Sequence, residues 1–378
     1  MDIKDFVSGS YREGYQYRYF LPESINHPWT WGDETINALL EKASLKLGEL
    51  NSYARLVPNI DMFIIMHVVK EAVVSSRIEG TRTSIEEALA DERDIDPEKR
   101  DDWIEVNNYI KAQNGAIEEL KTLPLSCRLI RDAHRILLSS GRGEYKTPGE
   151  FRLSQNWIGG ASLADAVFVP PAHLELPDLL SDLEAFLNNT SLRIPHLVRI
   201  AIAHYQFETI HPFLDGNGRI GRLLIALYLV SSGVLDRPLL YLSEFFDKNR
   251  GLYYDNLTLV RDKNDLGQWL RFFLTGVVET AAKSAETLQK IIALKGKVEK
   301  EHIFSMGKRS RQAHALLNGL FSKPIMTVAD VQECIGLTNK ASNDLVKAFV
   351  ERRILTEMTG FRRNRVFAFS DYMNLFTA

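Results

Sequence analysis

A run of twelve residues in the middle of the chain constrains its fold more than any other feature. It reads His211-Pro212-Phe213-Leu214-Asp215-Gly216-Asn217-Gly218-Arg219-Ile220-Gly221-Arg222. Residues 195–210 before it carry apolar side chains at helical spacing, and residues 223–230 after it are strongly apolar and favour a buried helix. Because Pro212 and Gly216 interrupt the pattern, the run predicts a tight loop between two core helices, the second beginning near Asn217.

The residue types in this run are those of a phosphate site. The free N–H groups at the start of a helix attract anions, and glycines let the backbone approach a phosphate. Arg219 and Arg222 lie three residues apart, so both can face one anion. An Asp215 carboxylate beside that anion favours a Mg²⁺ ion between them, and His211 can exchange a proton near neutral pH. Together they predict phosphate-group transfer, the alternative being a glycine-rich turn with a core histidine.

The run resembles the signature of the Fic family, His-Pro-Phe-x-Asp-Gly-Asn-Gly-Arg-x-x-Arg, at every defined position. The resemblance implies an all-helical core that transfers AMP from ATP, with Mg²⁺, to a Ser, Thr or Tyr hydroxyl of a target protein and of the chain itself. It implies that His211 is the catalytic base and that Asp215 holds the metal. The implied phosphate-binding residues are Gly216, Asn217, Gly218, Arg219, Gly221 and Arg222.

A second motif ends a predicted helix that covers about residues 58–80. Ser75-Ser76-Arg77-Ile78-Glu79-Gly80 closes this helix, and Gly80 suits a helix end. The helix dipole disfavours a carboxylate at this end unless a cation compensates it, so by helix physics alone Glu79 is a solvated side chain. Some Fic proteins carry Ser/Thr-x-x-x-Glu-Gly/Asn before the core, where its glutamate reaches the second arginine of the signature and blocks productive ATP binding. The resemblance implies that Ser75, Glu79 and Gly80 inhibit this chain through Arg222.

Residues 141–171 contain several glycines and prolines, which interrupt the helical spacing of apolar residues. Residues 155–158 and 166–169 predict the two strands of a β-hairpin. In Fic proteins a hairpin at this place, the flap, covers the site and holds an extended target segment by strand addition. Residues 156–159 resemble the part of the flap that lies near the nucleotide; they are Asn156, Trp157, Ile158 and Gly159.

Other aromatic, histidine and cysteine residues are less specific. Tyr253 and Tyr254 resemble the family position that packs on adenine, although aromatic side chains also suit an ordinary core. His134 has no second ligand at helical spacing and is interpreted as a packed or surface histidine. Cys127 and Cys334 lie far apart in helical patterns, which predicts buried thiols and no disulfide.

The whole chain predicts a mostly α protein in three parts. Residues 1–100 form an N-terminal helical region with the inhibitory helix, and its first thirty residues are expected to be an extended aromatic arm. Residues 101–280 form the Fic catalytic core with its flap. Residues 281–378 form a linker helix and a C-terminal winged helix-turn-helix domain.

The winged-helix prediction rests on three short helices, which begin at Arg311, and a hairpin. Thr327 and Thr338 open two of the helices, and residues 354–369 read as two strands around a turn at Gly360. Three arginines on the wing suit contact with DNA phosphates: Arg362, Arg363 and Arg365. The expected recognition helix carries few basic residues, Lys340 and Lys347, so DNA binding is not favoured over protein interaction. The alternative function is a nucleotide-sensing, DNA-binding regulator.

The composition limits the classes of protein to which the chain can belong. Hydrophobic residues make up 45% of the 378 residues and charged residues 25%, as in an ordinary soluble globular protein. The longest apolar run is too short to span a bilayer, so a cytoplasmic protein without a membrane partner is expected. The net charge of −3 argues against bulk nucleic-acid binding. The sequence is compatible with a homo-oligomer but does not determine the oligomeric state.

Overall fold

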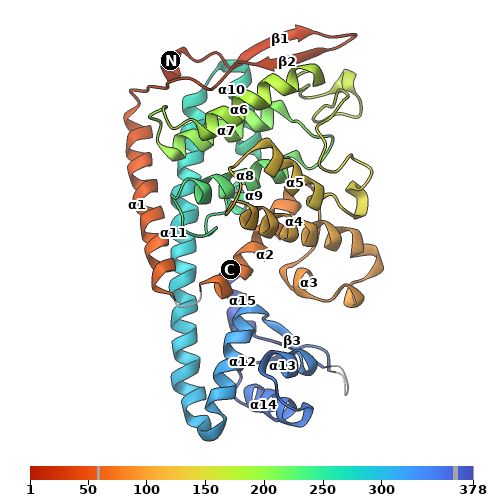
Figure 1. Ribbon diagram of the computed structural model, residues 1–378, viewed down its shortest axis with the longest axis vertical. Coiled ribbons are helices and arrows are strands. Elements are labelled where there is room, and N and C mark those ends of the chain that lie inside the picture. The colour runs from red at the N-terminus through yellow and green to blue at the C-terminus, as the bar shows by residue number, and fades with distance from the viewer. Residues whose placement is uncertain (58–59, 361–364, 378) are drawn as a thin grey trace.

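The computed structural model describes residues 1–57, 60–360 and 365–377, and it is mostly helical (Figure 1). This confirms the predicted mostly α class. The helices are α1 (Glu34–Leu56), α2 (Asp61–Ile78), α3 (Ile85–Leu89), α4 (Arg100–Glu119), α5 (Cys127–Leu137), α6 (Leu176–Asn188), α7 (His196–Ile210), α8 (Asn217–Ser231), α9 (Ser243–Lys248), α10 (Arg250–Lys263), α11 (Leu266–Val298), α12 (Ser310–Ser322), α13 (Val328–Ile335), α14 (Asn339–Glu351) and α15 (Ser370–Thr377). The strands are β1 (Gly9–Glu13), β2 (Arg18–Pro22), β3 (Ile325–Thr327), β4 (Thr356–Glu357) and β5 (Val366–Ala368).

Helices α7 and α8 form the centre of the molecule. Every residue from Leu197 to Ile210 is buried, and α8 is buried along most of its length. A helix that is apolar on all faces needs other helices around it, and α4, α5, α6 and α11 supply them. The expected loop therefore lies between two core helices, and α8 begins at Asn217 as predicted.

The long helix α11 connects the core with the C-terminal elements. Figure 1 shows α11 running down one side of the molecule with α1 packed along it. The first part of α11 buries large side chains in the core, Trp269 and Phe273 among them. The predicted boundary at residue 280 falls inside this helix, and the boundary at residue 100 falls on the first residue of α4. The start of the predicted inhibitory helix, at residue 58, lies outside the described residues.

The first thirty residues are more ordered than the predicted arm. Residues 9–22 form an antiparallel hairpin in which Gly9 pairs with Pro22. Strand β2 alternates between exposed and buried side chains, a period that favours a strand with one covered face. The Phe20 N–H also donates to the Val169 carbonyl at 2.9 Å, so the hairpin lies against the segment that follows the predicted flap.

The two predicted flap strands do not form a ladder. Residues 155–169 contain one antiparallel bridge, between Ile158 and Phe168. Gly159 and Gly160 turn the chain with φ of 69° and 74°, and the Asp165 carboxylate accepts the N–H groups of residues 161 and 162. The predicted hairpin is therefore present as this one bridge, and the prediction of a longer ladder is wrong.

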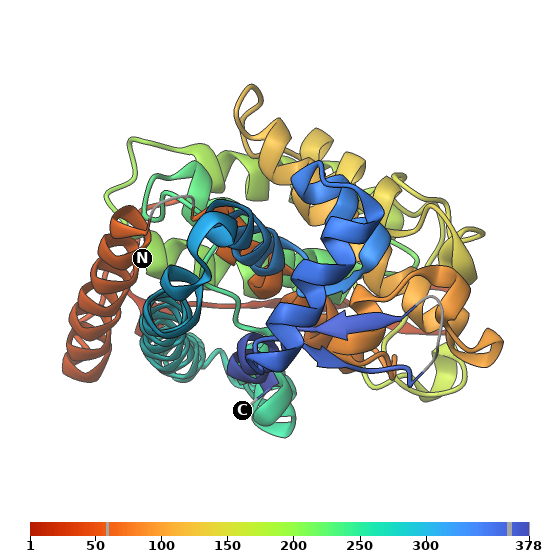
Figure 2. The same cartoon turned by 90° about the horizontal axis from the view of Figure 1, so that it is seen from below.

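The C-terminal elements form a compact unit against the lower end of the core. Strands β3, β5 and β4 make an antiparallel sheet in that order, α13 packs on β3, and α12 and α14 pack on α13. Thr327 caps α13, Gly336 ends it with φ 65°, and Thr338 caps α14, as their positions predicted. Figure 2 looks from below and shows this unit in front of the core helices. Arg362 and Arg363 lie outside the described residues.

Two further expectations have clear outcomes. Cys127 and Cys334 are both free thiols, but Cys127 is only partly buried and Cys334 is exposed, although its sulfur lies against Gly319 of α12, so the prediction of two buried thiols is wrong. In the parts of the chain that the structure describes, no helix combines the length and the apolar character needed to cross a bilayer.

Candidate functional site

The twelve-residue run closes into a loop through the side chain of Asn217. Its amide oxygen accepts the Phe213 N–H at 2.8 Å, and its amide nitrogen donates to the Phe213 carbonyl at 2.9 Å. Gly216 has φ 75°, a conformation that favours glycine, and α8 starts at the next residue. Since the first N–H groups of a helix have no partner within it, the start of α8 can bind an anion.

His211 lies at the end of α7 in a left-handed conformation, with φ 50° and ψ 60°. This conformation is strained for a residue with a side chain, and strain of this kind persists where surrounding contacts hold it. The His211 ring is partly buried, and burial lowers its pKa to about 4. The imidazole is therefore neutral at physiological pH and can accept a proton.

Arg152 holds this strained residue, and sequence reasoning missed it. The side chain is fully buried and donates to the carbonyl oxygens of His211 at 3.0 Å, Pro171 at 2.6 Å and Ile210 at 3.3 Å. An arginine in a glycine-rich stretch carries no signal of this role. Its partners are backbone groups that only the folded chain brings together.

The residues predicted from the flap lie beside the signature loop. The Asn156 amide donates to the His211 carbonyl at 3.2 Å and to the Phe213 carbonyl at 2.8 Å, so it holds the loop. Trp157 is 42% exposed beside it, Ile158 makes the flap bridge, and Gly159 provides the turn.

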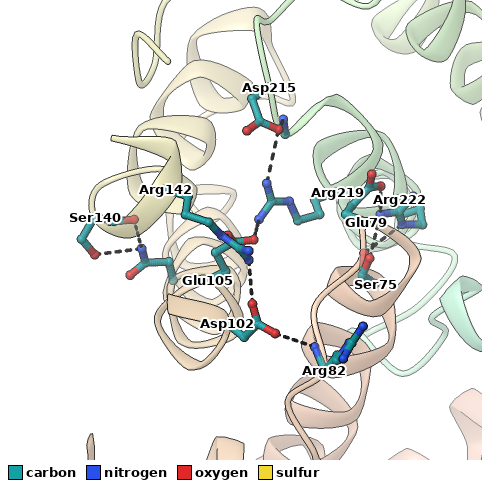
Figure 3. A network of polar contacts seen from close by, with 12 residues as sticks. Ser75, Glu79, Arg82, Asp102, Glu105, Ser140, Arg142, Asp215, Arg219 and Arg222 are labelled. Carbon is teal, nitrogen blue, oxygen red and sulfur yellow. Dashed lines mark hydrogen bonds and ion pairs between the residues drawn. The ribbon is translucent and has the colours of Figure 1, made fainter. Parts of the chain in front are cut away.

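Arg222 is bound by the end of α2 (Figure 3). Its guanidinium donates to Glu79 Oε1 at 2.6 Å, to Ser75 Oγ at 2.8 Å and to the Ser75 carbonyl at 2.9 Å. Glu79 is the residue after the last turn of α2, and Gly80 follows with φ 108°. Burial alone would raise the pKa of Glu79, but the Arg222 guanidinium outweighs burial and lowers it. The cation that this helix end requires is therefore Arg222.

Two glycines of the run have carboxylates packed directly on them. A Cβ on Gly218 would clash with Glu79 Oε1, and a Cβ on Gly221 would clash with Glu208 Oε1. Glu208, on α7, is buried and was not predicted from the sequence. The Glu79 carboxylate thus occupies the space against the first turn of α8, where an anion would approach the helix.

Arg219 pairs with a different carboxylate from Arg222, and whether both face one anion stays a prediction. Arg219 lies 3.1 Å from Glu105 Oε2 on α4 and 3.6 Å from Asp215 Oδ1. Figure 3 shows this network continuing from Glu105 to Arg142. Residues three apart differ by only about 60° around a helix, and in this structure the Arg219 side chain extends to α4 while that of Arg222 extends to α2.

Asp215 is the one carboxylate of the twelve-residue run. Its side chain is 46% exposed, and Oδ1 accepts the Gly216 N–H at 2.6 Å. Among residues 1–57, 60–360 and 365–377, no group of three or more His, Cys, Asp or Glu side chains is arranged to hold a metal ion. A single accessible carboxylate fits Mg²⁺ that arrives with phosphate oxygens, since this ion keeps most ligands from water and phosphate.

The two predicted adenine contacts separate in the structure. Tyr253 is 1% exposed, its hydroxyl lies 2.9 Å from His204 Nε2, and its ring stacks on Phe246. In this structure Tyr253 is a core residue whose polar end is bonded inside, and its contact with the nucleotide stays a prediction. Tyr254 is 42% exposed and keeps a face open.

Comparison with known families covers the site and the helices before it. Residues 37–118 match the family model described as Fic/DOC family N-terminal. Residues 124–229 match the model described as Fic/DOC family, and the twelve-residue run lies within that range. The chain carries a Fic/DOC family domain.

Curated relatives share part of this chain. A protein adenylyltransferase Fic of Aedes aegypti is 35% identical over 144 residues, 38% of this chain and 26% of the relative. One of Drosophila grimshawi is 30% identical over 194 residues, 51% of this chain and 36% of the relative. The chain thus spans about a quarter to a third of the length of these relatives.

Solved structures show the same fold. A Fic family protein from Desulfovibrio desulfuricans G20 superposes with a TM-score of 0.55 at 20% identity, covering 91% of this chain and 98% of the other. A Fic domain containing signaling protein from Bacteroides thetaiotaomicron VPI-5482 superposes with a TM-score of 0.52 at 19% identity, covering 68% and 97%. The helical Fic fold is therefore shared.

Proposed function

We propose that this Fic protein is an autoinhibited protein adenylyltransferase that transfers AMP from ATP to a hydroxyl side chain of a target protein and of itself. The observation that supports this most is the Glu79 carboxylate, which is bound to Arg222 and lies against Gly218 at the start of α8. A carboxylate in this place excludes a phosphate from the same guanidinium and the same helix end. The adenylyltransferase relatives support the choice of AMP.

The reaction proposed for the open site follows from the loop. Neutral His211 takes the proton of the target hydroxyl, the hydroxyl oxygen bonds to the α-phosphorus of ATP, and pyrophosphate leaves. The first N–H groups of α8, with Arg219 and Arg222, stabilise the charge on the phosphates. Asp215 would hold Mg²⁺, which neutralises phosphate charge when it is bound. Arg152 and Asn156 keep the base in place by holding the His211 carbonyl.

Inhibition follows from competition for one planar group. The Arg222 guanidinium can pair with a carboxylate or with the γ-phosphate, but not with both in the same geometry. While Glu79 holds it, ATP binds without that clamp and its α-phosphate is poorly aligned. A misplacement of about 1 Å can cost roughly a hundredfold in rate.

The test is self-modification with α-labelled ATP. Glu79→Gly should raise labelling strongly, and Glu79→Gly with Arg222→Ala should lose that gain, since the freed arginine is its source. Glu118→Gly is the matched control, because Glu118 is an exposed glutamate in the last turn of another helix, α4, paired with Lys121. Equal labelling of wild type and Glu79→Gly would mean that Glu79 only ends a helix.

The target is proposed to bind as an extended segment at the flap. The flap exposes Val167, at 80%, and Trp157, at 42%, beside the bridge between Ile158 and Phe168. An added strand would gain main-chain hydrogen bonds there, and these side chains would contact it.

The C-terminal unit is proposed to be a winged helix that contacts protein. The order α13, α14, β4 and β5 supports a helix-turn-helix with a wing. The exposed residues of α14 include both Lys340 and Lys347 and the acidic Asp344 and Glu351, and Lys347 lies 3.9 Å from Glu351. A mixed surface of this kind does not favour DNA phosphates. A salt-sensitive shift of DNA by the full chain, without protein labelling, would support the DNA-binding regulator instead.

A further inference from the structure

A buried histidine connects three parts of the site that lie far apart in the sequence. His134, on α5, is fully buried, and its ring stacks on Phe213 with 3.7 Å between centroids and 7° between planes. Its Nδ1 lies 2.9 Å from the Gly149 nitrogen, and its Nε2 lies 3.0 Å from the Asp215 carbonyl oxygen. One ring thus joins α5, the segment before the flap and the signature loop.

The partners determine which ring nitrogen carries the proton. The Gly149 backbone N–H can only donate, so Nδ1 must be the acceptor and carry no hydrogen. A neutral imidazole then has its hydrogen on Nε2, which donates to the Asp215 carbonyl. Both nitrogens are used, and the ring cannot turn over without losing both bonds.

This arrangement holds one end of the peptide between Asp215 and Gly216. The carbonyl of that peptide accepts from His134, and its N–H donates to the Asp215 carboxylate at 2.6 Å. A Cβ on Gly216 would approach to 3.2 Å of Leu137 Cδ2 and 3.4 Å of His134 Nε2, so α5 packs closely against the peptide. The bond from His134 therefore sets the orientation of the peptide, and with it the directions of the carboxylate and of the N–H.

We propose that His134 is a positioning residue that keeps the Asp215 carboxylate and the Gly216 N–H directed at the phosphates of the same nucleotide. In the structure these two groups bond to each other. When the carboxylate turns to a metal–nucleotide complex, the N–H becomes free for a phosphate oxygen, and the His134 bond keeps the peptide in place. This inference rests on the proposed function, because it takes a nucleotide as the ligand.

Two substitutions separate the two bonds of the ring. The side-chain amide nitrogen of His134→Gln can take the place of Nε2 and donate to the Asp215 carbonyl. The amide oxygen of His134→Asn can take the place of Nδ1 and accept the Gly149 N–H, but it leaves the Asp215 carbonyl without a donor. Both substitutions are made in the full chain that also carries Glu79→Gly, so that the site is open. This Glu79→Gly protein is the parent of the two variants. His196→Asn, at the far end of α7, is the control.

The readouts are binding of Mg²⁺–ATP by titration calorimetry, with and without EDTA, thermal unfolding, and labelling with α-labelled ATP. His134→Asn should weaken Mg²⁺–ATP binding by about 10- to 100-fold, the usual range for residues that orient a metal ligand. It should also reduce the difference in affinity that Mg²⁺ makes, while His134→Gln keeps both near the parent values at a similar Tm.

The outcomes separate this proposal from the proposed function. If His134→Asn binds Mg²⁺–ATP like the parent, or if both variants lose binding only in proportion to Tm, His134 is a structural residue and the proposal is wrong. If the parent shows no transfer but the two variants still differ in binding, the positioning role stands and the adenylyltransferase proposal fails. A parent that does not bind Mg²⁺–ATP would overturn both.

Discussion

At the scale of single residues, the site depends on backbone groups that buried side chains hold in place. His211 is in a left-handed conformation, and the Arg152 guanidinium binds its carbonyl and those of Ile210 and Pro171. The planar guanidinium reaches several carbonyls at once, which a lysine ammonium on a flexible stem cannot do. The position of the proposed base is therefore set by a residue that does not face the reaction.

Arg152→Lys should lower the transfer rate of the Glu79→Gly protein by about 10- to 100-fold, because a base displaced by about 1 Å loses alignment. ATP affinity should change less, since Arg152 donates to backbone carbonyls and not to the nucleotide. Labelling kinetics and calorimetry measure the two effects. Arg135→Lys, on the exposed surface of α5, is the control. An equal loss in both variants, or a loss of affinity alone, would contradict this role.

The pH dependence of transfer should reflect the lowered pKa of His211. Only the neutral imidazole accepts a proton, and burial brings its pKa from 6.5 to about 4. Glu79 raises this pKa, so removing Glu79 lowers it further. For Glu79→Gly, kcat/KM should therefore persist as the pH falls through 6.5 and decline only near or below 4. A decline centred on 6.5 would mean that a solvated histidine is the base.

At the scale of elements, α2 carries the inhibitory contacts on its last turns. The Arg222 guanidinium donates hydrogen bonds to the hydroxyl and carbonyl oxygens of Ser75 and to the carboxylate of Glu79. Ser75 and Glu79 lie four residues apart, so both lie on one face of the helix. The helix thus presents a complete set of acceptors to one guanidinium.

Ser75→Ala should raise self-modification a few-fold, less than Glu79→Gly does, because it removes one of the three bonds to Arg222 and leaves the ion pair. Labelling with α-labelled ATP gives the order of the variants. Ser76→Ala is the matched control, since Ser76 is the next buried serine of the same helix and its hydroxyl has no hydrogen-bond partner. Ser76→Ala labelling as strongly as Ser75→Ala would show that loss of helix stability, and not of the contact, opens the site.

At the scale of the whole molecule, the C-terminal unit packs on the other end of α2. The Phe63 ring lies 5.0 Å from that of Phe321 on α12, and the His67 ring lies 5.0 Å from that of Phe376 on α15. Phe63 is 2% exposed, so these contacts bury the start of the helix that ends at Glu79. A change in the C-terminal unit can therefore reach Arg222 through one continuous helix.

Phe321→Ala should raise self-modification in the full chain, because it loosens the contact that holds α2. Removing a buried phenylalanine costs about 3–5 kcal/mol of stability, so the control needs a similar cost. Phe349→Ala supplies it, since Phe349 is fully buried on α14 within the C-terminal unit. Tm and labelling are measured for both. If Phe321→Ala and Phe349→Ala have equal Tm values and equal labelling, the C-terminal unit does not affect the inhibitory helix.

The sequence by itself determined the parts that depend on neighbouring residues. Helical spacing and the Gly216 turn predicted two core helices and the start of the second at Asn217, because these patterns act within a few residues. Gly80, Thr327 and Gly336 marked helix ends for the same reason. The twelve-residue run pointed to the Fic fold through its resemblance to the family signature.

Tertiary structure decided which distant groups meet. Arg152, Glu105 and His134 reach the signature loop across 59 to 114 positions of the chain, and no local pattern records such partners. Contacts between residues far apart in the sequence also include the bond of Tyr253 to His204 inside the core and the bond by which Asn156 holds the loop. Side-chain hydrogen bonds depend on where the packed helices bring each group, and that position is a property of the assembled core.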